Sequence, residues 1–325
     1  MKEYSTERGS HMAKILVTTR MQPQIRERLS AAGHVLVLCD AVSWEEKCAA
    51  AKDCEAVACR GGAYPAAFFE ALPKLRILAL PSAGYDQVDL ESARAHHVIV
   101  TNAGSGNARS VAEMACLLML SAAKKMTYNT AVVTSGGPWR NPKQPTFSEV
   151  SGKTIALLGY GNIAREMDHL CRGFDMKIIA YHPRISQKAL PEGTVPCDDL
   201  ALAVKDADIV SCHIPARPEN YHFLDATFFA SMKPGALFIN TGRGSVVDEA
   251  ALIDALRCGH LGGAGLDVFE EEPTPATNPL LHMDNVVCMP HIGGETREAK
   301  ERVYGIAAEN VLRVLSGKAP LSPVT

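Results

Sequence analysis

The sequence alternates short, β-rich apolar runs with amphipathic stretches along almost its whole length. Helical stretches separate the apolar runs. One of them is expected at 43–53, where Ser43 is a residue type that caps helices. Such alternation is typical of a parallel sheet with helices on both faces, so the sequence predicts an α/β fold. The first strands are expected at 14–20, 34–40, 55–60, 75–81 and 97–103.

A second alternating series follows residues 136–152, which are rich in Pro, Gly and Ser and are therefore expected to form a loop. Two long helices, expected at 107–125 and 296–317, would be the crossings between two domains. A length of 325 residues also suggests about two domains. We expect two doubly wound parallel sheets, the second larger than the first. Its strands are expected at 154–160, 177–182, 194–199, 208–215, 236–242, 261–269 and 285–291.

The composition is that of an ordinary globular protein, with 47% hydrophobic and 21% charged residues. A net charge of −3 gives no attraction to nucleic acid or to an anionic membrane. No stretch approaches the ~20 apolar residues of a membrane helix. We therefore expect neither nucleic acid nor a membrane as a partner.

Residues 1–12 read MKEYSTERGSHM, whose GSHM ending is typical of a cloning scar, so we interpret them as an expression tag. The 10 cysteines include no CxxC pair, and several lie within apolar runs. We expect buried free thiols, a reducing compartment and a cytoplasmic protein without a metal site. A catalytic thiol or a zinc site is the alternative.

A glycine-rich turn follows the strand expected at 154–160. Gly159, Gly161 and Ala164 fit the pattern G-x-G-x-x-[G/A], and a helix and another strand come next. The first glycine allows the tight turn, the second lets the backbone approach a pyrophosphate, and the third small residue allows close packing of helix and strand. This context predicts a dinucleotide site with phosphates at the helix N-terminus. A purely structural glycine turn is the alternative.

The strand that follows this helix ends in His182 rather than in an acid. An NAD site normally has Asp or Glu here to bind the ribose 2′-hydroxyl. Without that carboxylate a 2′-phosphate is not repelled, and His182 and Arg184 could bind it. We therefore favour NADP, or the use of both cofactors, over NAD alone. The alternative is that both are solvated loop residues.

Four side chains that could take part in catalysis or binding follow three later strands. Arg243 follows the strand at 236–242, Asp267 and Glu272 the strand at 261–269, and His291 the last strand. Parallel α/β folds bind ligands at these carboxyl ends of the strands. Each residue alone would more often be an ordinary surface or loop residue. Together, beside a dinucleotide loop, they predict a catalytic site.

Several motifs follow one another along the chain. They are SAGYDQVDL (82–90), SVAE (110–113), GYGNIA (159–164), NTGRG (240–244), GLDVFEEEP (265–273) and PHIGG (290–294). With these motifs the chain resembles the D-isomer-specific 2-hydroxyacid dehydrogenases from residue 14 to about residue 317. That family has two α/β domains with an active-site cleft between them, and its members are commonly homodimers. The resemblance implies a Rossmann dinucleotide-binding domain at 105–293, inserted in a smaller flavodoxin-like substrate domain at 13–104 and 294–325.

The chemistry of a 2-hydroxy acid fits these residues. Arg243 can hold a carboxylate bidentately, and His291 can act as base in oxidation and as acid in reduction. Glu272 would orient the imidazole and stabilise its protonated form. The resemblance implies that Asp267 holds the nicotinamide carboxamide and that backbone amides at 83–84 bind the substrate carboxylate. Arg60 could contact a substrate anion or be an ordinary exposed charge.

The expected reaction is hydride transfer between a nicotinamide and a small 2-hydroxy or 2-oxo acid such as glyoxylate or hydroxypyruvate. A short phosphoglycerate dehydrogenase is the alternative enzyme, and a dinucleotide-gated corepressor or scaffold is the alternative of another class. Possible pocket walls are Tyr85, Trp139 and Met289. The residues expected at the substrate are Arg60, Ala83, Gly84 and Arg243. Those expected at the cofactor are Gly159, Tyr160, Gly161, Asn162, Ile163, His182, Arg184, His213, Pro215, Thr241, Asp267, His291 and Gly293.

Overall fold

The structure, a computed structural model, describes residues 12–139, 145–185 and 189–325. The proposed tag therefore lies outside the described residues, except for Met12. The chain forms two units: the first runs to Asn107 and includes Thr296–Thr325, and the second is Ala108–Glu295. The first junction falls three residues, and the second two residues, beyond the domain boundary expected from the sequence.

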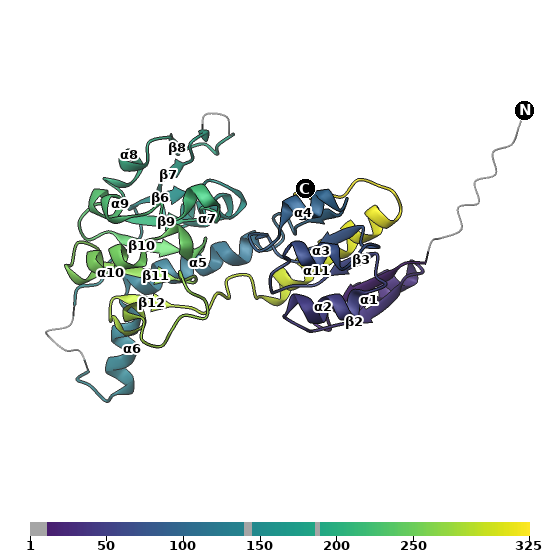
Figure 1. Ribbon diagram of the computed structural model, residues 1–325. Helices are drawn as coiled ribbons and strands as arrows, with labels where there is room; N and C mark the ends of the chain where they lie inside the picture. Colours follow the sequence, from purple (N-terminus) through teal and green to yellow (C-terminus); the bar gives the residue numbers. More distant parts are fainter. Residues whose placement is uncertain (1–11, 140–144, 186–188) are drawn as a thin grey trace, which may run out of the picture. The chain divides into compact units, whose positions relative to one another are not determined.

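The first unit is a five-stranded parallel sheet in the order β2-β1-β3-β4-β5 (Figure 1). This is the flavodoxin-like order that we expected. The cap predicted for the helix after Ser43 is confirmed, because the Ser43 side chain accepts a hydrogen bond from the N–H of Glu46. The strands are β1 Lys14–Val17, β2 Val35–Leu38, β3 Ala56–Ala58, β4 Ile77–Ala79 and β5 Ile99–Thr101. The helices are α1 Pro23–Ala31, α2 Trp44–Ala51, α3 Ala66–Glu70, α4 Leu90–Ala95 and α11 Arg297–Leu315.

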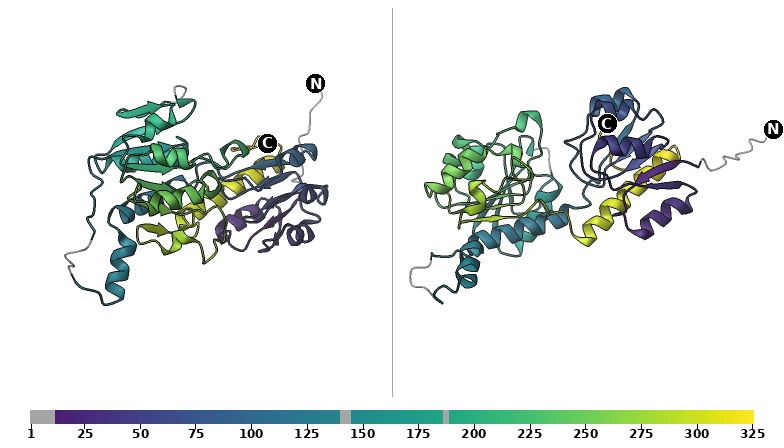
Figure 2. Two further views of the ribbon diagram at one scale, coloured as in Figure 1. Left: turned by 60° about the vertical axis from the view of Figure 1, so that its left-hand side comes forward. Right: turned by 60° about the horizontal axis from the view of Figure 1, so that its bottom comes forward.

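Helix α11 comes from the end of the chain and completes this N-terminal unit. It packs on β3, β4 and α1, and it is the yellow helix beside the purple and blue strands in Figures 1 and 2. Because alternate residues of a strand point to opposite faces, Ile15 and Val17 pack with α11, whereas Leu16 packs with Phe68 and Phe69 on the other face. Both faces of the sheet are therefore buried.

The second unit is a seven-stranded parallel sheet in the order β12-β11-β10-β9-β6-β7-β8. It is the dinucleotide-binding strand order with one further strand, so the α/β fold class predicted from the sequence is confirmed. The strands are β6 Thr154–Leu158, β7 Lys177–Tyr181, β8 Thr194–Cys197, β9 Ile209–Cys212, β10 Leu237–Asn240, β11 Gly263–Leu266 and β12 Val286–Cys288. The helices are α5 Ala108–Ala123, α6 Met126–Thr134, α7 Asn162–Arg172, α8 Leu200–Val204, α9 Ala226–Ser231 and α10 Glu249–Arg257.

Helix α6 was not predicted from the sequence. None of its residues is buried, and Figures 1 and 2 show it extending away from the sheet of its unit. The described residues of the segment 136–152 form a loop as expected, and residues 140–144 lie outside the described part. In the ranges that the structure describes, no helix combines the length and the apolarity needed to cross a membrane.

Candidate active site

The glycine-rich turn joins β6 to α7 at the point where the strand order of the second sheet reverses. Gly159 has φ +81°, and a Cβ there would lie 3.0 Å from the backbone of His213, so the turn requires glycine. The N–H groups of Gly159 and Tyr160 donate to the carbonyl of Tyr181 at 3.0 and 3.2 Å. At Gly161 the nearest atom to a Cβ, the Gly159 oxygen, is 3.9 Å away. The turn therefore leaves space above Gly161 for a ligand.

Helix α7 begins at this turn without a side-chain cap, whereas α8, α9 and α10 are each capped by an aspartate. Its N-cap is Gly161, and Asn162 and Ile163 form its exposed or half-buried first residues. An uncapped helix N-terminus presents N–H donors and a positive dipole end, which suit a phosphate. The turn and α7 therefore fit the pyrophosphate of a dinucleotide.

The other residues expected at the adenosine end lie beside the turn. His182 directly follows β7, the neighbour of β6, and its Nδ1 accepts the N–H of Arg184 at 2.9 Å. This bond places the imidazole proton of neutral His182 on Nε2. The Tyr160 side chain is fully buried, so this residue can face a ligand only through its backbone.

The candidate residues of the second unit follow five adjacent strands at one edge of the sheet. In sheet order, His291 follows β12, Asp267 follows β11, Arg243 follows β10, His213 follows β9 and the glycine turn follows β6. Thr241 and Pro215 follow β10 and β9 at the same edge. The carboxyl ends of parallel strands form a common ligand-binding edge. The structure therefore brings together residues that are as much as 132 positions apart, from Gly159 to His291.

His291 and Glu272 form a hydrogen-bonded pair at this edge. The Nδ1 atom of His291 lies 2.6 Å from Oε2 of Glu272, whose Oε1 accepts the N–H of Phe269 at 2.9 Å. Burial alone would raise the pKa of Glu272, but the bonds from His291 and Phe269 outweigh it and lower the pKa. Glu272 thus remains a carboxylate that orients the ring, and Nε2 of His291 is the nitrogen that can exchange a proton with a ligand.

Asp267 holds the loop that carries His291. Its side chain is buried, and its two oxygens accept the N–H groups of Ile292 and Gly293 at 2.9 and 2.8 Å. Burial raises the pKa of Asp267, although these backbone bonds oppose the shift. His291 adopts φ +55°, which is uncommon for a residue other than glycine. The hydroxyl of Ser110, within the SVAE motif, donates to the Gly293 carbonyl at 2.6 Å. The sequence motif contained Ser110, but its function in holding this loop was not predicted.

Arg243 lies on a second loop with its own support. The Asn240 side chain accepts the N–H of Gly242 at 3.0 Å and donates to the Arg243 carbonyl at 3.1 Å. A Cβ on Gly244 would lie 1.8 Å from the Phe269 oxygen, so only glycine fits beside the loop that leads to Glu272. The charge of Arg243 contributes to the lowered pKa of Glu272. Asn240 was not singled out in the sequence, although an asparagine at a strand end often makes such local backbone bonds.

Candidate substrate residues of the first unit also share one sheet edge. Arg60 follows β3, and Ala83 and Gly84 follow the neighbouring β4. The Ala83 carbonyl accepts a bond from the Asn102 side chain at 2.8 Å, and the Gly84 carbonyl accepts one from the Ser82 hydroxyl at 2.9 Å. Both loop carbonyls are therefore held by side chains of the unit. Of the possible pocket walls, Tyr85 and Met289 are half-buried and Trp139 is exposed.

Neither a metal centre nor a disulfide emerges among the described residues. All 10 cysteines are free thiols, and burial raises the pKa of Cys59 and Cys212 to about 12. Within the described ranges no group of three or more His, Cys, Asp or Glu side chains is arranged to hold a metal ion. The thiols with raised pKa values are packing residues rather than nucleophiles at neutral pH.

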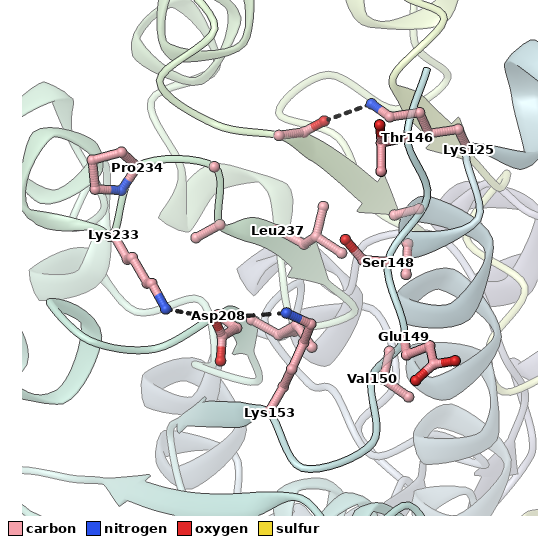
Figure 3. Close-up of a pocket in the computed structure, with 16 residues that line it drawn as sticks. Lys125, Thr146, Ser148, Glu149, Val150, Lys153, Asp208, Lys233, Pro234 and Leu237 are labelled. Atoms are coloured by element: carbon pink, nitrogen blue, oxygen red, sulfur yellow. Dashed lines mark hydrogen bonds and ion pairs between the residues drawn. The ribbon is translucent and has the colours of Figure 1, made fainter. Parts of the chain in front are cut away.

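A hollow of about 330 Å³ lies at the opposite edge of the second sheet (Figure 3). It borders the residues that precede β6, β9 and β10. Lys233 and Lys153 lie 2.6 and 3.9 Å from Asp208, as the dashed lines in Figure 3 mark. The hollow therefore lies away from the glycine turn and the His291–Glu272 pair, which occupy the carboxyl ends of the strands.

The comparisons with known proteins agree with this geometry. The family model of the D-isomer specific 2-hydroxyacid dehydrogenase, NAD binding domain, matches residues 116–293. This range includes the glycine turn and the loops that carry Arg243, Glu272 and His291. The chain belongs to the D-isomer specific 2-hydroxyacid dehydrogenase family. Its second unit is the one that would bind a nicotinamide dinucleotide.

Relatives of this dehydrogenase family cover most of the chain. A D-3-phosphoglycerate dehydrogenase from Methanocaldococcus jannaschii is 35% identical over 309 residues, 94% of this chain and 58% of the relative. A glyoxylate reductase from Thermococcus litoralis is 37% identical over 257 residues, 77% of each chain. The structure of an NADPH-dependent glyoxylate/hydroxypyruvate reductase from Sinorhizobium meliloti in complex with citrate matches with a TM-score of 0.84 and 28% identity, covering 96% of this chain and 98% of that one. The chain spans about half the length of the phosphoglycerate dehydrogenases that it matches.

The buried His213 predicts that the stability of this protein depends on pH. Its ring nitrogens lie 3.0 Å from the Ser211 hydroxyl and 3.2 Å from the Thr241 hydroxyl, and burial lowers its pKa to about 4. The unfolded chain protonates this histidine near pH ~6.5, whereas the folded chain stays neutral. The free energy of unfolding should therefore be fully retained above pH ~6.5 and fall by up to about 3 kcal/mol as the pH drops to ~4.

Urea unfolding of the wild type and of His213→Gln across this pH range tests the prediction. Other titrating groups cancel in the difference, so the two free energies should converge as the pH falls. Parallel curves would show that His213 does not cause the loss of stability.

Proposed function

We propose that this protein is an NAD(P)-dependent D-2-hydroxyacid dehydrogenase that transfers a hydride between a nicotinamide and C2 of a small 2-hydroxy or 2-oxo acid. The observation that carries the proposal is the 2.6 Å pair of Glu272 and His291, on the sheet edge that also presents Arg243 and the glycine turn. This edge combines a proton donor, a carboxylate-binding cation and a dinucleotide loop. Glyoxylate and hydroxypyruvate are the proposed substrate type.

Each of the three catalytic residues has a separate function in this proposal. Arg243 binds the substrate carboxylate and thereby fixes which face of C2 is presented. His291 gives a proton from Nε2 to the carbonyl oxygen in reduction and takes it back in oxidation. Glu272 holds the ring through Nδ1 and stabilises the protonated imidazole. A bound nicotinamide supplies or accepts the hydride.

The remaining binding residues are proposed from their places at the two sheet edges. Residues 105–293 would form the dinucleotide domain, and residues 13–104 with 294–325 the substrate domain. Arg60 and the backbone amides of Ala83 and Gly84 would contact the substrate anion. Asp267 would accept a bond from the nicotinamide carboxamide while keeping its bonds to Ile292 and Gly293, since a carboxylate oxygen has two lone pairs.

We propose NADP as the preferred cofactor. His182 occupies the place of the acid that would repel a 2′-phosphate, and its Nε2–H is a donor for such a group. Arg184, two residues on, adds an exposed positive charge. The related reductase from Sinorhizobium meliloti is NADPH-dependent, which supports the same choice.

Two further properties belong to the proposal. Ten free cysteines suit a reducing compartment, so we place the protein in the cytoplasm. Helix α6 leaves Met126 and Val133 more than half exposed, and Trp139 beyond it is 81% exposed. A second copy of the chain could cover this apolar surface, which supports a homodimer.

A panel of substrates and cofactors tests the proposal. Purified protein with NADPH or NADH is mixed with glyoxylate, hydroxypyruvate or 3-phosphohydroxypyruvate, and absorbance is followed at the ~340 nm band of the reduced nicotinamide. We expect a higher kcat/KM with glyoxylate or hydroxypyruvate than with the phosphorylated acid, and a higher one with NADPH than with NADH.

Other outcomes of the panel would select the alternatives. Preference for the phosphorylated acid would favour a short phosphoglycerate dehydrogenase, the activity named for the Methanocaldococcus jannaschii relative. Dinucleotide binding without turnover of any acid would favour a dinucleotide-gated corepressor or scaffold. A strong preference for NADH would contradict the choice of NADP.

A further inference from the structure

Tyr160 lies at the centre of the glycine turn but points away from the ligand side. Its side chain is fully buried, and its hydroxyl donates to Oδ2 of Asp168 on α7 at 2.6 Å. The guanidinium of Arg165 covers the ring, 5.1 Å from its centroid. Because Gly159 and Gly161 have no side chains, Tyr160 is the residue through which a side chain can hold the turn.

Besides the Tyr160 hydroxyl, two other side chains donate hydrogen bonds to the carboxylate of Asp168. Arg172 donates from Nε to Oδ1 at 2.7 Å, and Thr194 on β8 donates from its hydroxyl to Oδ2 at 2.6 Å. Arg172 also donates from Nη2 to the Thr194 hydroxyl at 2.7 Å. Asp168 is fully buried, and the arginine compensates its charge. A satisfied buried network of this kind has one geometry, so it fixes the groups attached to it.

This network connects the glycine turn with two neighbouring elements of the second unit. Tyr160 belongs to the turn, Asp168 and Arg172 to the helix whose N-terminus faces the turn, and Thr194 to the edge strand β8. Burial, together with the hydrogen bond to Asp168 and its charge, raises the pKa of Tyr160, so the phenol stays a donor at neutral pH. Two kinds of contact therefore hold the turn: the bond from the Tyr160 side chain to Asp168, and the bonds from its backbone N–H groups to the Tyr181 carbonyl.

We infer that Tyr160, Asp168, Arg172 and Thr194 form a buried brace that positions the N–H groups of the turn for the pyrophosphate of the cofactor. Tyr160 is thus a positioning residue, which acts on the cofactor through its own backbone. This inference rests on the proposed dinucleotide binding. It adds four side chains to the cofactor site, three of which the sequence did not suggest.

The test is the affinity of Tyr160→Phe for NADPH, measured by fluorescence titration. The substitution keeps the ring and its contact with Arg165 but removes the bond to Asp168. We expect the dissociation constant to rise about tenfold, a loss of about 1.4 kcal/mol. The unfolding temperature of the same variant is measured beside the titration, because a purely structural bond would lower it without changing the affinity for NADPH.

Two further variants separate positioning from general stability. Thr194→Val removes another bond to Asp168, at a distance from the turn. It should also raise the dissociation constant for NADPH. Tyr64→Phe, in the other unit, removes a buried tyrosine bond to the Cys59 carbonyl. It should lower the unfolding temperature as Tyr160→Phe does, but leave the affinity for NADPH unchanged.

Unchanged affinity in Tyr160→Phe, with lowered thermal stability, would overturn the inference and give the network a purely structural function. Because the readout is binding rather than turnover, it does not depend on which acid is the substrate. Tight binding of NADPH without turnover would contradict the proposed reaction and leave the brace intact. A raised dissociation constant for Tyr64→Phe as well would also overturn the inference, since the effect would then be general.

Discussion

We expect His291→Ala to lower kcat for reduction of a 2-oxo acid by roughly 10²- to 10⁴-fold, the usual loss when a positioned acid is removed. The imidazole lies 2.6 Å from Glu272 and is 45% exposed, so it is oriented but still accessible to a ligand. The dissociation constant for NADPH should change little, because the turn that holds the pyrophosphate is untouched. Steady-state kinetics and a fluorescence titration measure the two quantities.

A second variant separates proton transfer from backbone strain, because His291 has a positive φ that alanine tolerates poorly. His291→Asn keeps a residue that accepts this conformation but cannot titrate, and it should lose as much activity as the alanine variant. Activity close to that of the wild type in His291→Asn would refute the assignment of the acid.

The chain also offers a matched control for the His291 variants. His222 has φ +49° and lies 2.6 Å from Glu270, so it forms a similar pair elsewhere in the same unit. His222→Asn should have a kcat within about twofold of the wild type, since His222 is not one of the candidate residues at the carboxyl ends of the strands. An equal loss in this control would show that such pairs act through the fold rather than through the reaction.

We expect Arg243→Gln to lower kcat/KM for glyoxylate by roughly 10²- to 10³-fold, because the proposed charged hydrogen-bonded pair with the substrate carboxylate would be lost. Arg243→Lys should recover only part of it, since an ammonium cannot make the bidentate contact. Arg257→Gln, in the exposed last turn of α10, is the control and should behave as the wild type.

A substrate without a carboxylate shows whether Arg243 acts on that group. With a simple aldehyde such as glycolaldehyde, the wild type and Arg243→Gln should differ by less than about threefold. If the arginine instead supports only the loop, both substrates would lose activity equally. A binding titration with NADPH completes the test, because the affinity of the dinucleotide should be the same in both proteins.

The elements of both sheets could be predicted because each strand is a short apolar run between amphipathic helices. In a sheet covered on both faces this pattern is required, as Ile15 and Leu16 show by packing on opposite faces. Helix α6 escaped prediction because periodicity detects a helix through its buried face, and α6 has no buried residue. Its sequence MTYNTAVVT is also rich in β-branched residues, which favour strands.

The sequence could predict the residues of the candidate site that follow a strand. It could not predict the side-chain hydrogen bonds that hold those residues in place. Arg243, Glu272 and His291 could be selected because each follows an expected strand, and the ends of parallel strands share an edge. Asn240 ends a strand but was not selected, and Asp168 lies within a helix and has no such signal. They act through bonds to one loop or one buried carboxylate, and a sequence does not give these distances.

The sequence alone was enough to predict the α/β class, the glycine turn and the candidate residues for proton transfer and carboxylate binding. These follow from local patterns and from side-chain chemistry. The folded chain adds the contacts: Glu272 lies 2.6 Å from His291, Asp267 holds the loop beyond it, and Tyr160 turns inward to Asp168. The physical reason is that a hydrogen bond requires a distance near 3 Å between groups far apart in the chain, and packing of the whole unit sets that distance.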